Sequence, residues 1–83
     1  MPDLEAQRIF GVVVRQARER LHLSQEGLAA EAGLHRTYIS LLERGRRTPS
    51  LTVILQLATA LGLSATDLLL SLIHISEPTR LGM

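Results

Sequence analysis

The stretch LSQEGLAAEAGLHRTYISLLERG, residues 23–45, decides the fold, because its apolar residues recur at helical spacing on both sides of one glycine. Ser24 is a good N-cap for a helix over Gln25–Ala32, which the following glycine ends. A second helix of roughly ten residues, over residues 35–44, stops at Gly45. We therefore predict two short helices joined by a tight turn.

Three positions in this stretch, four and six residues apart, specify how the two helices pack. Ala29 leaves space for the second helix to cross the first closely, and Gly33 can adopt the positive φ that a tight turn requires. Ile39, together with Leu42, anchors the second helix to the core. These residues predict a helix-turn-helix.

The chain on either side also follows a helical period. Apolar residues spaced by four, three and four predict a helix from about Leu4 to Leu21 with one apolar stripe. The stripe consists of Phe10, Val14, Ala17 and Leu21. A helix is expected over Leu51–Leu61, and Ser64 with Asp67 forms a capping box that starts a short fifth helix. The residues that we expect to be buried in the fourth helix are Leu51, Ile54, Leu57, Ala58 and Leu61. Because no alternating strand pattern occurs, we predict an all-α bundle of five helices.

The composition restricts the class of protein. The 83 residues are enough for one small domain with a single core. Without cysteine, the chain has no disulfide, no thiolate nucleophile and no cysteine zinc site. No apolar run is long enough to span a bilayer, and the first residues lack the pattern of a signal peptide. We therefore expect a soluble, cytoplasmic protein that is not bound to a membrane.

Candidate catalytic and metal-binding groups are few. His22, His35 and His74 lack the short spacing of metal ligands, so no metal and no cofactor are expected. No carboxylate is spaced to complete a catalytic triad with Ser24, Ser40 and His35. A helical domain of this size also has little room for a pocket that excludes water. We expect no enzymatic activity.

Basic residues concentrate in the second helix of the central stretch and just after it. This region holds four of the chain's nine arginines against one glutamate, although the formal net charge of the chain is only +1. Ile39 and Leu42 are expected to face the core. The 100° turn per residue of an α-helix then places Thr37, Leu41 and Arg44 on the outward side. A helix with such a face fits the major groove of DNA.

Through LSQEGLAAEAGLHRTYISLLERG and then PSLTVILQLATALGLS, residues 49–64, the chain resembles the Xre-type, lambda-repressor-like family of DNA-binding domains. The likeness covers about residues 8–69. It implies a compact five-helix bundle that binds double-stranded DNA as a small transcriptional regulator. We expect a homodimeric repressor on a two-fold operator whose half-sites lie about 34 Å apart.

The resemblance also implies roles for individual residues. Those implied to read base edges are Arg36, Thr37 and Ser40, with Leu41 as a candidate for an apolar contact. Those implied to contact phosphates are Gln25, Tyr38, Arg44, Arg46 and Arg47. A partly buried ion pair between Arg18 and Glu43 is implied to orient the recognition helix. Tyr38 could equally pack against the preceding helix, because tyrosine has an apolar body and a polar tip.

Two other functions are compatible with the same fold. The chain could be the DNA-targeting domain of a larger protein, an antitoxin or a ligand-sensing regulator, that is truncated after residue 69. It could also be a protein-interaction module that does not bind DNA. The basic, outward-facing surface argues against the second alternative, since such a module has no need of it.

The last fourteen residues, LSLIHISEPTRLGM, match no element of this family. The first eleven of them resemble the translation of a sequencing adaptor in one frame. We therefore expect residues 1–69 to form the DNA-binding domain and residues 70–83 to be a non-native tail. The alternative is a native extension, because LLLSLIHI is apolar enough to pack or to dimerise.

Overall fold

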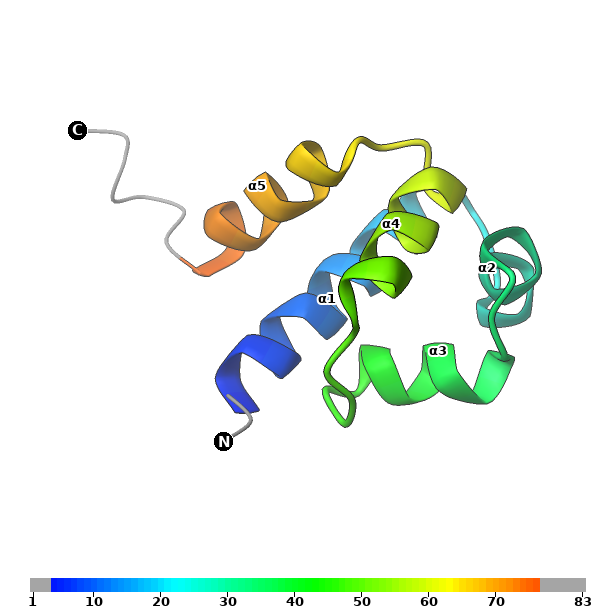
Figure 1. Cartoon of the computed structure of the whole chain (residues 1–83), viewed down its shortest axis with the longest axis horizontal. Coiled ribbons are helices and arrows are strands. Elements are labelled where there is room, and N and C mark those ends of the chain that lie inside the picture. Colours follow the sequence, from blue (N-terminus) through cyan, green and yellow to red (C-terminus); the bar gives the residue numbers. More distant parts are fainter. Residues whose placement is uncertain (1–3, 77–83) are drawn as a thin grey trace.

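The computed structural model describes residues 4–76, with side chains described for residues 4–71, and this part of the chain forms five α-helices and no strand (Figure 1). The helices are α1 (Leu4–Arg20), α2 (Gln25–Ala32), α3 (Arg36–Glu43), α4 (Leu51–Ala60) and α5 (Ala65–Ser76). α1 packs against α3 and α5, α2 packs against α3 and α4, and α4 packs against α5. Figure 1 shows α3 along the lower edge of the molecule, with α5 on the opposite side. The predicted all-α, five-helix fold is confirmed.

The connection between α2 and α3 is the predicted tight turn. The Ser24 side chain caps α2 by accepting a hydrogen bond from the N–H of Gly27 at 2.9 Å. Gly33 ends α2 with φ 71°, a left-handed conformation. Glycine adopts this conformation at little energetic cost because it has no Cβ atom. The Leu34 N–H then donates to the Ala29 carbonyl at 2.9 Å. These local interactions fix the helix-turn-helix.

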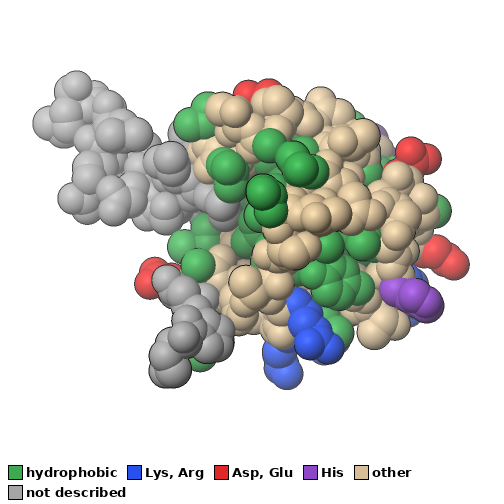
Figure 2. All heavy atoms as spheres, viewed as in Figure 1, with side chains coloured by type: hydrophobic (Ala, Val, Ile, Leu, Met, Phe, Trp, Pro, Cys, Tyr) green, Lys and Arg blue, Asp and Glu red, His purple; other side chains and the backbone are tan. Residues whose placement is uncertain are grey.

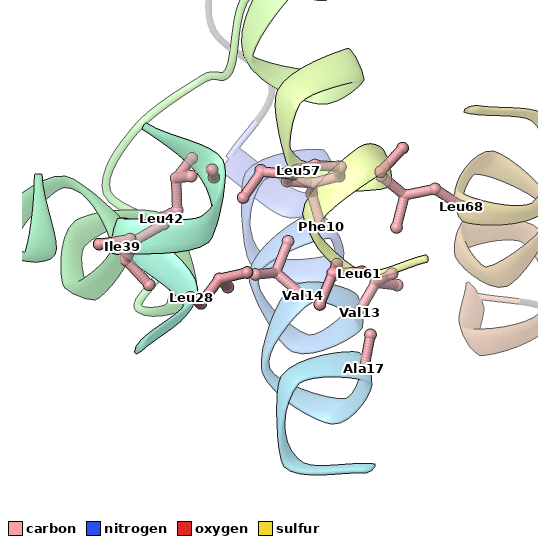
Figure 3. Packing of buried hydrophobic residues seen from close by; sticks show 13 residues of the cluster. Phe10, Val13, Val14, Ala17, Leu28, Ile39, Leu42, Leu57, Leu61 and Leu68 are labelled. Carbon is pink, nitrogen blue, oxygen red and sulfur yellow. The ribbon is translucent and has the colours of Figure 1, made fainter. Parts of the chain in front are cut away.

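A single hydrophobic cluster joins all five helices (Figure 3). Its fully buried larger side chains are Val14, Leu28, Ile39, Leu42, Leu57 and Leu68. Figure 3 shows Ile39 and Leu42 of α3 on one side of the α1 side chains and Leu68 of α5 on the other. Each helix therefore depends on α1 or on its neighbours for the burial of its apolar face, as expected for helices of only 8 to 17 residues.

Two residues that we expected in the core are exposed. Leu21 is 50% exposed, because α1 ends at Arg20 and the chain then turns through His22, which has φ 59°. Leu51 is 71% exposed, because it is the first residue of α4 and lies outside the face that packs on the core. In the same helix, Ile54 is only half-buried. The expectation that these leucines are buried was therefore wrong.

α5 is longer than the short helix that we predicted. The Ser64 hydroxyl accepts a hydrogen bond from the Asp67 N–H at 3.0 Å, as expected for the cap. The helix then continues to Ser76, so the change of sequence pattern at Leu70 does not end it. Residues 77–83 of the expected tail lie outside the described residues.

No single described helix is both long and apolar enough to cross a membrane. α4 and the first part of α5 reach that length and composition only together, and they are bent by 96° with respect to each other.

Candidate nucleic-acid interface

α3 has one face in the core and one face toward solvent. Ile39 and Leu42 are fully buried, which fixes the rotation of the helix about its axis. On its other sides, Arg36 and Thr37 are exposed, and Ser40 is half-buried. Residues four apart share a helix face, so Ser40 lies one turn from Arg36. Leu41 is also half-buried. The structure thus brings the four expected base-reading residues together on one short helix.

Three further arginines follow these residues at the C-terminal end of α3. Arg44 occupies the C-cap position, and its Nε donates to the Ser40 carbonyl at 3.3 Å. Arg46 and Arg47 lie in the loop between α3 and α4, and all three side chains are exposed. Figure 2 shows basic side chains at the lower edge of the molecule, where α3 and this loop lie in Figure 1. The edge formed by α3 and the loop is therefore positively charged.

Two expected phosphate contacts are partly engaged inside the protein. Tyr38 is half-buried and packs against the hydrophobic cluster. Gln25 is also half-buried, and its Nε2 donates to Glu43 Oε1 at 3.1 Å. A primary amide has two N–H donors, so this bond leaves Gln25 with a second donor. Sequence reasoning did not identify the bond to Glu43.

Arg18 and Glu43 form an ion pair between α1 and α3. Arg18 Nε donates to Glu43 Oε2 at 2.6 Å and Nη2 donates to Oε1 at 3.0 Å, the two-pronged geometry that favours arginine. The side chains are only 12% and 3% exposed. The hydrogen bond from Arg18 to Glu43 raises the pKa of the guanidinium above its ordinary value. Arg18 Nη1 also donates to the Leu23 carbonyl at 2.8 Å, so one side chain connects α1, the turn before α2, and α3.

A close backbone contact accompanies the ion pair. A Cβ atom on Gly11 would lie 2.4 Å from the Leu42 carbonyl oxygen and 2.7 Å from that of Glu43, closer than real Cβ atoms approach. Gly11 therefore lets the backbone of α1 lie directly on the last carbonyls of α3. Sequence reasoning missed this residue. The available signal was a glycine isolated within a helical pattern, which often marks close packing.

The histidines do not gather into a metal site in the described part of the chain. Among residues 4–71, whose side chains the structure describes, no group of three or more His, Cys, Asp or Glu side chains is placed to hold a metal ion. His22 and His35 are exposed, one after α1 and the other at the N-cap of α3. The side chain of His74 lies outside the described residues.

Comparison with known proteins connects this surface to a family. The helix-turn-helix family model matches residues 14–68. The control protein C.BamHI of Bacillus amyloliquefaciens is 52% identical over 62 residues, which cover 74% of this chain and 76% of that protein. The control protein C.SmaI of Serratia marcescens is 42% identical over 74 residues, 83% of this chain and 88% of that protein. The crystal structure of the restriction-modification controller protein C.AhdI from Aeromonas hydrophila is 45% identical, with a TM-score of 0.73 over 75% of this chain and 94% of that one.

Proposed function

From the premise that the chain belongs to the Xre-type helix-turn-helix family and is a DNA-binding regulator of transcription, we propose that it acts as a homodimeric repressor on a two-fold operator. The observation that carries this proposal is the outward face of α3, where polar side chains stand opposite the buried Ile39 and Leu42 and continue into an arginine-rich loop. The proposal also places the protein in the cytoplasm and assigns it no enzymatic activity.

Two of the four proposed base readers, Arg36 and Thr37, lie in the first turn of α3, at the end away from the ion-paired Glu43. Arg36 can hold a guanine by two hydrogen bonds, and the hydroxyls of Thr37 and Ser40 can bond several base edges. Leu41 offers an aliphatic surface to the methyl group of a thymine. All four occur within six residues, so the sequence specificity of the protein would reside in a turn and a half of helix.

The proposed phosphate contacts lie mostly toward the C-terminal end of α3. Arg44, Arg46 and Arg47 are exposed at this end, and Gln25, the first residue of α2, lies beside it through its hydrogen bond to Glu43. Tyr38 can present its hydroxyl while its ring remains packed on the core. Contacts of this kind set the register and the orientation of the protein on DNA, and they carry little sequence information.

The comparisons favour a small, independent regulator over the DNA-targeting domain of a larger protein. The similar region makes up 76% of C.BamHI, 88% of C.SmaI and 94% of C.AhdI, so these relatives are themselves small. Two of them are named control proteins, and the third is a restriction-modification controller protein. We extend that role to this chain and propose that it controls the genes of a restriction-modification system.

Exposed leucines on α4 and α5 support the homodimer. Leu51, Leu55 and Leu69 are between 44% and 71% exposed, on two helices that pack against each other. Figure 2 shows hydrophobic side chains on the face turned to the viewer, over these two helices, whereas α3 lies at the lower edge. A second copy that covers this apolar surface would leave the DNA-binding edge of both copies accessible.

The domain is proposed to end near residue 69, followed by a non-native tail over residues 70–83. The family match supports this boundary because it ends at residue 68. The helical backbone of α5 passes the boundary and ends at Ser76, which is compatible with a foreign segment that continues an existing helix.

Selection from a random duplex pool tests the proposed function. We expect the protein to enrich a two-fold motif at fixed, moderate salt. On the enriched site, Arg36→Ala should weaken binding by about 1 to 3 kcal/mol and relax one base position. Arg46→Ala should weaken binding to all duplexes similarly. It should also reduce the slope of log K against the logarithm of the salt concentration by about one. Equal losses on operator and random DNA for both variants would contradict the division into base readers and phosphate contacts.

Sedimentation of two leucine variants tests the homodimer. Leu55→Asp places a charge on the exposed apolar face of α4, and we expect it to sediment as a monomer and to lose the tight binding of a two-fold site. Leu21→Asp is the matched control. Leu21 is 50% exposed, close to the 48% of Leu55, and it directly follows the last residue of α1, away from the proposed interface. A wild-type monomer, or two variants that both remain dimeric, would refute this interface.

A further inference from the structure

The N-terminal half of α1 lies against the loop that follows α3. The Gln7 Nε2 donates a hydrogen bond to the Thr48 hydroxyl in that loop. A Cβ atom on Gly45 would lie 2.8 Å from Cγ and 3.0 Å from Cα of Arg8. Gly45 has φ 72°, so this residue allows both the turn of the chain and the close approach of α1. The side chain of Arg8 therefore starts directly beside the loop.

This contact places Arg8 next to the proposed phosphate contacts. Gly45 stands between Arg44 and Arg46 in the sequence, and the side chains of all three arginines are exposed. Neither the Arg15–Glu19 ion pair nor the Arg18–Glu43 ion pair involves Arg8. Arg8 thus adds a positive charge to an edge that already carries several.

Two carboxylates lie near this edge, Glu43 and Glu5. Glu43 is the nearest acidic residue in the sequence, but its side chain is 3% exposed and bonded to Arg18 and Gln25. Glu5 lines a hollow on α1 together with Arg8 and offsets one of the four exposed arginine charges at this edge, those of Arg8, Arg44, Arg46 and Arg47. Like charges that gather on one surface repel each other until an anionic partner covers them. A polyanion is the ligand that suits such a surface.

We propose that Arg8 contacts a DNA phosphate beside those bound by Arg44 and Arg46, so that α1 forms part of the DNA-binding surface. This inference rests on the proposed function, because it assigns a further residue to the same DNA complex. It enlarges the DNA-binding unit, which then includes α1 as well as α2, α3 and the loop. Arginine suits the task because its planar guanidinium binds phosphate oxygens through two donors.

A purely structural role for Arg8 makes a different prediction. Arg8 lies near the C-terminal end of α3, where the helix dipole favours a cation. A charge that only neutralised the end of the helix would influence the melting temperature. It would leave the number of ions released on DNA binding unchanged, because that number counts phosphates neutralised by the protein.

The dependence of DNA affinity on salt separates these roles. The full chain and three variants are titrated with one mixed-sequence duplex over a series of KCl concentrations, and log K is plotted against log [KCl]. For Arg8→Ala we expect the slope to become shallower by about 0.9 per bound protomer. Arg8→Lys should retain the slope, because lysine also neutralises a phosphate. Circular dichroism and thermal melting confirm that each variant is folded.

Arg20→Ala is the matched control. It removes one exposed arginine from the same helix, and its site lies twelve residues away, about 18 Å along the axis. That distance exceeds the Debye length of about 10 Å at 0.1 M salt, so Arg20 is screened from the phosphate that we assign to Arg8. The slope of log K against log [KCl] for Arg20→Ala should therefore equal that of the wild type. The wild type could show a steep dependence of log K on log [KCl] that neither Arg8→Ala nor Arg20→Ala changes. That result would overturn the role of Arg8 and leave the proposed function intact. A wild type whose binding shows no salt dependence would overturn the proposed function itself.

Discussion

The two ends of α3 are held in different ways. At the C-terminal end, Glu43 is bonded to two side chains, and the carbonyl groups of Leu42 and Glu43 lie against the backbone of Gly11. At the N-terminal end, His35 occupies the N-cap position without a side-chain hydrogen bond to the helix. The next two residues, Arg36 and Thr37, are exposed. One helix of eight residues is thus fixed by the protein at one end and open to solvent at the other.

This difference separates the orientation of the helix from its reading of DNA. An isolated helix of eight residues is not stable in water, so packing decides where α3 lies. The polar contacts that fix it are concentrated around Glu43, about one and a half to two turns from Arg36 and Thr37. The polar groups that would bond bases are therefore not occupied by contacts within the protein.

Glu43→Ala should have the largest effect on stability. It leaves the guanidinium of Arg18 nearly buried without its carboxylate partner, a loss on the order of 3 to 5 kcal/mol. Small domains have about 5 to 15 kcal/mol in total, so the melting temperature should fall by many degrees. Thermal melting followed by circular dichroism measures the change.

Glu19→Ala provides the control for this variant. Glu19 also pairs with an arginine, Arg15, but the two side chains are 53% and 64% exposed, and such pairs contribute about 0 to 1 kcal/mol. Its melting temperature should stay close to that of the wild type. If Glu43→Ala melted at the same temperature as Glu19→Ala, the ion pair would not be what fixes this end of α3.

Gly11→Ala should have the second largest effect. The added methyl group would overlap the carbonyl oxygens of Leu42 and Glu43, and overpacking of this kind costs about 1 to 3 kcal/mol. Alanine regains up to about 1 kcal/mol from its higher helix propensity, so the net change should be destabilising. Displacement of α3 should also weaken specific DNA binding more than non-specific binding, which titrations with operator and random duplexes measure.

Gly27→Ala is the matched glycine substitution. A Cβ atom there would meet the Ser24 hydroxyl at 3.2 Å and a methyl carbon of Leu23 at 3.5 Å, both on side chains. We expect a change in stability of less than about 1 kcal/mol and unaltered DNA specificity. If both glycine variants behaved alike, the close contact between α1 and α3 would not position the recognition helix.

The same contrast explains how much could be predicted from the sequence. The helix-turn-helix depends on local signals, a serine cap at Ser24 and a left-handed glycine at Gly33, and these are legible in a single sequence. The helical period also identified Ile39 as a core residue. Leu21 and Leu51 were misjudged because a period shows which residues share a face and does not show where the helix itself begins and ends.

The contacts around the fixed end depend on tertiary structure and were harder to predict. The close approach at Gly11 depends on where α1 crosses α3, and no local pattern specifies that crossing. The bond from Gln25 to Glu43 joins residues that lie eighteen apart in the sequence. The continuation of α5 beyond Leu70 was not predicted, because residues 70–83 match no element of the family. Apolar residues can nevertheless extend a helix that is already nucleated.

His35→Ser should have the smallest effect and should act at the open end. The backbone of His35 already has the extended conformation of an N-cap, with φ −81° and ψ 142°, so a serine hydroxyl there can accept a hydrogen bond from the first turn of α3. We expect a gain of about 0.5 to 1 kcal/mol, seen as a slightly higher melting temperature. Ser24→Ala, which removes an existing cap, should produce a loss of similar size. Operator affinity then decides what the open end does: unchanged affinity at a higher melting temperature would show that the ordering of α3 comes entirely from its fixed end. Weaker binding by a more stable variant would show that the uncapped end takes part in the contact with DNA.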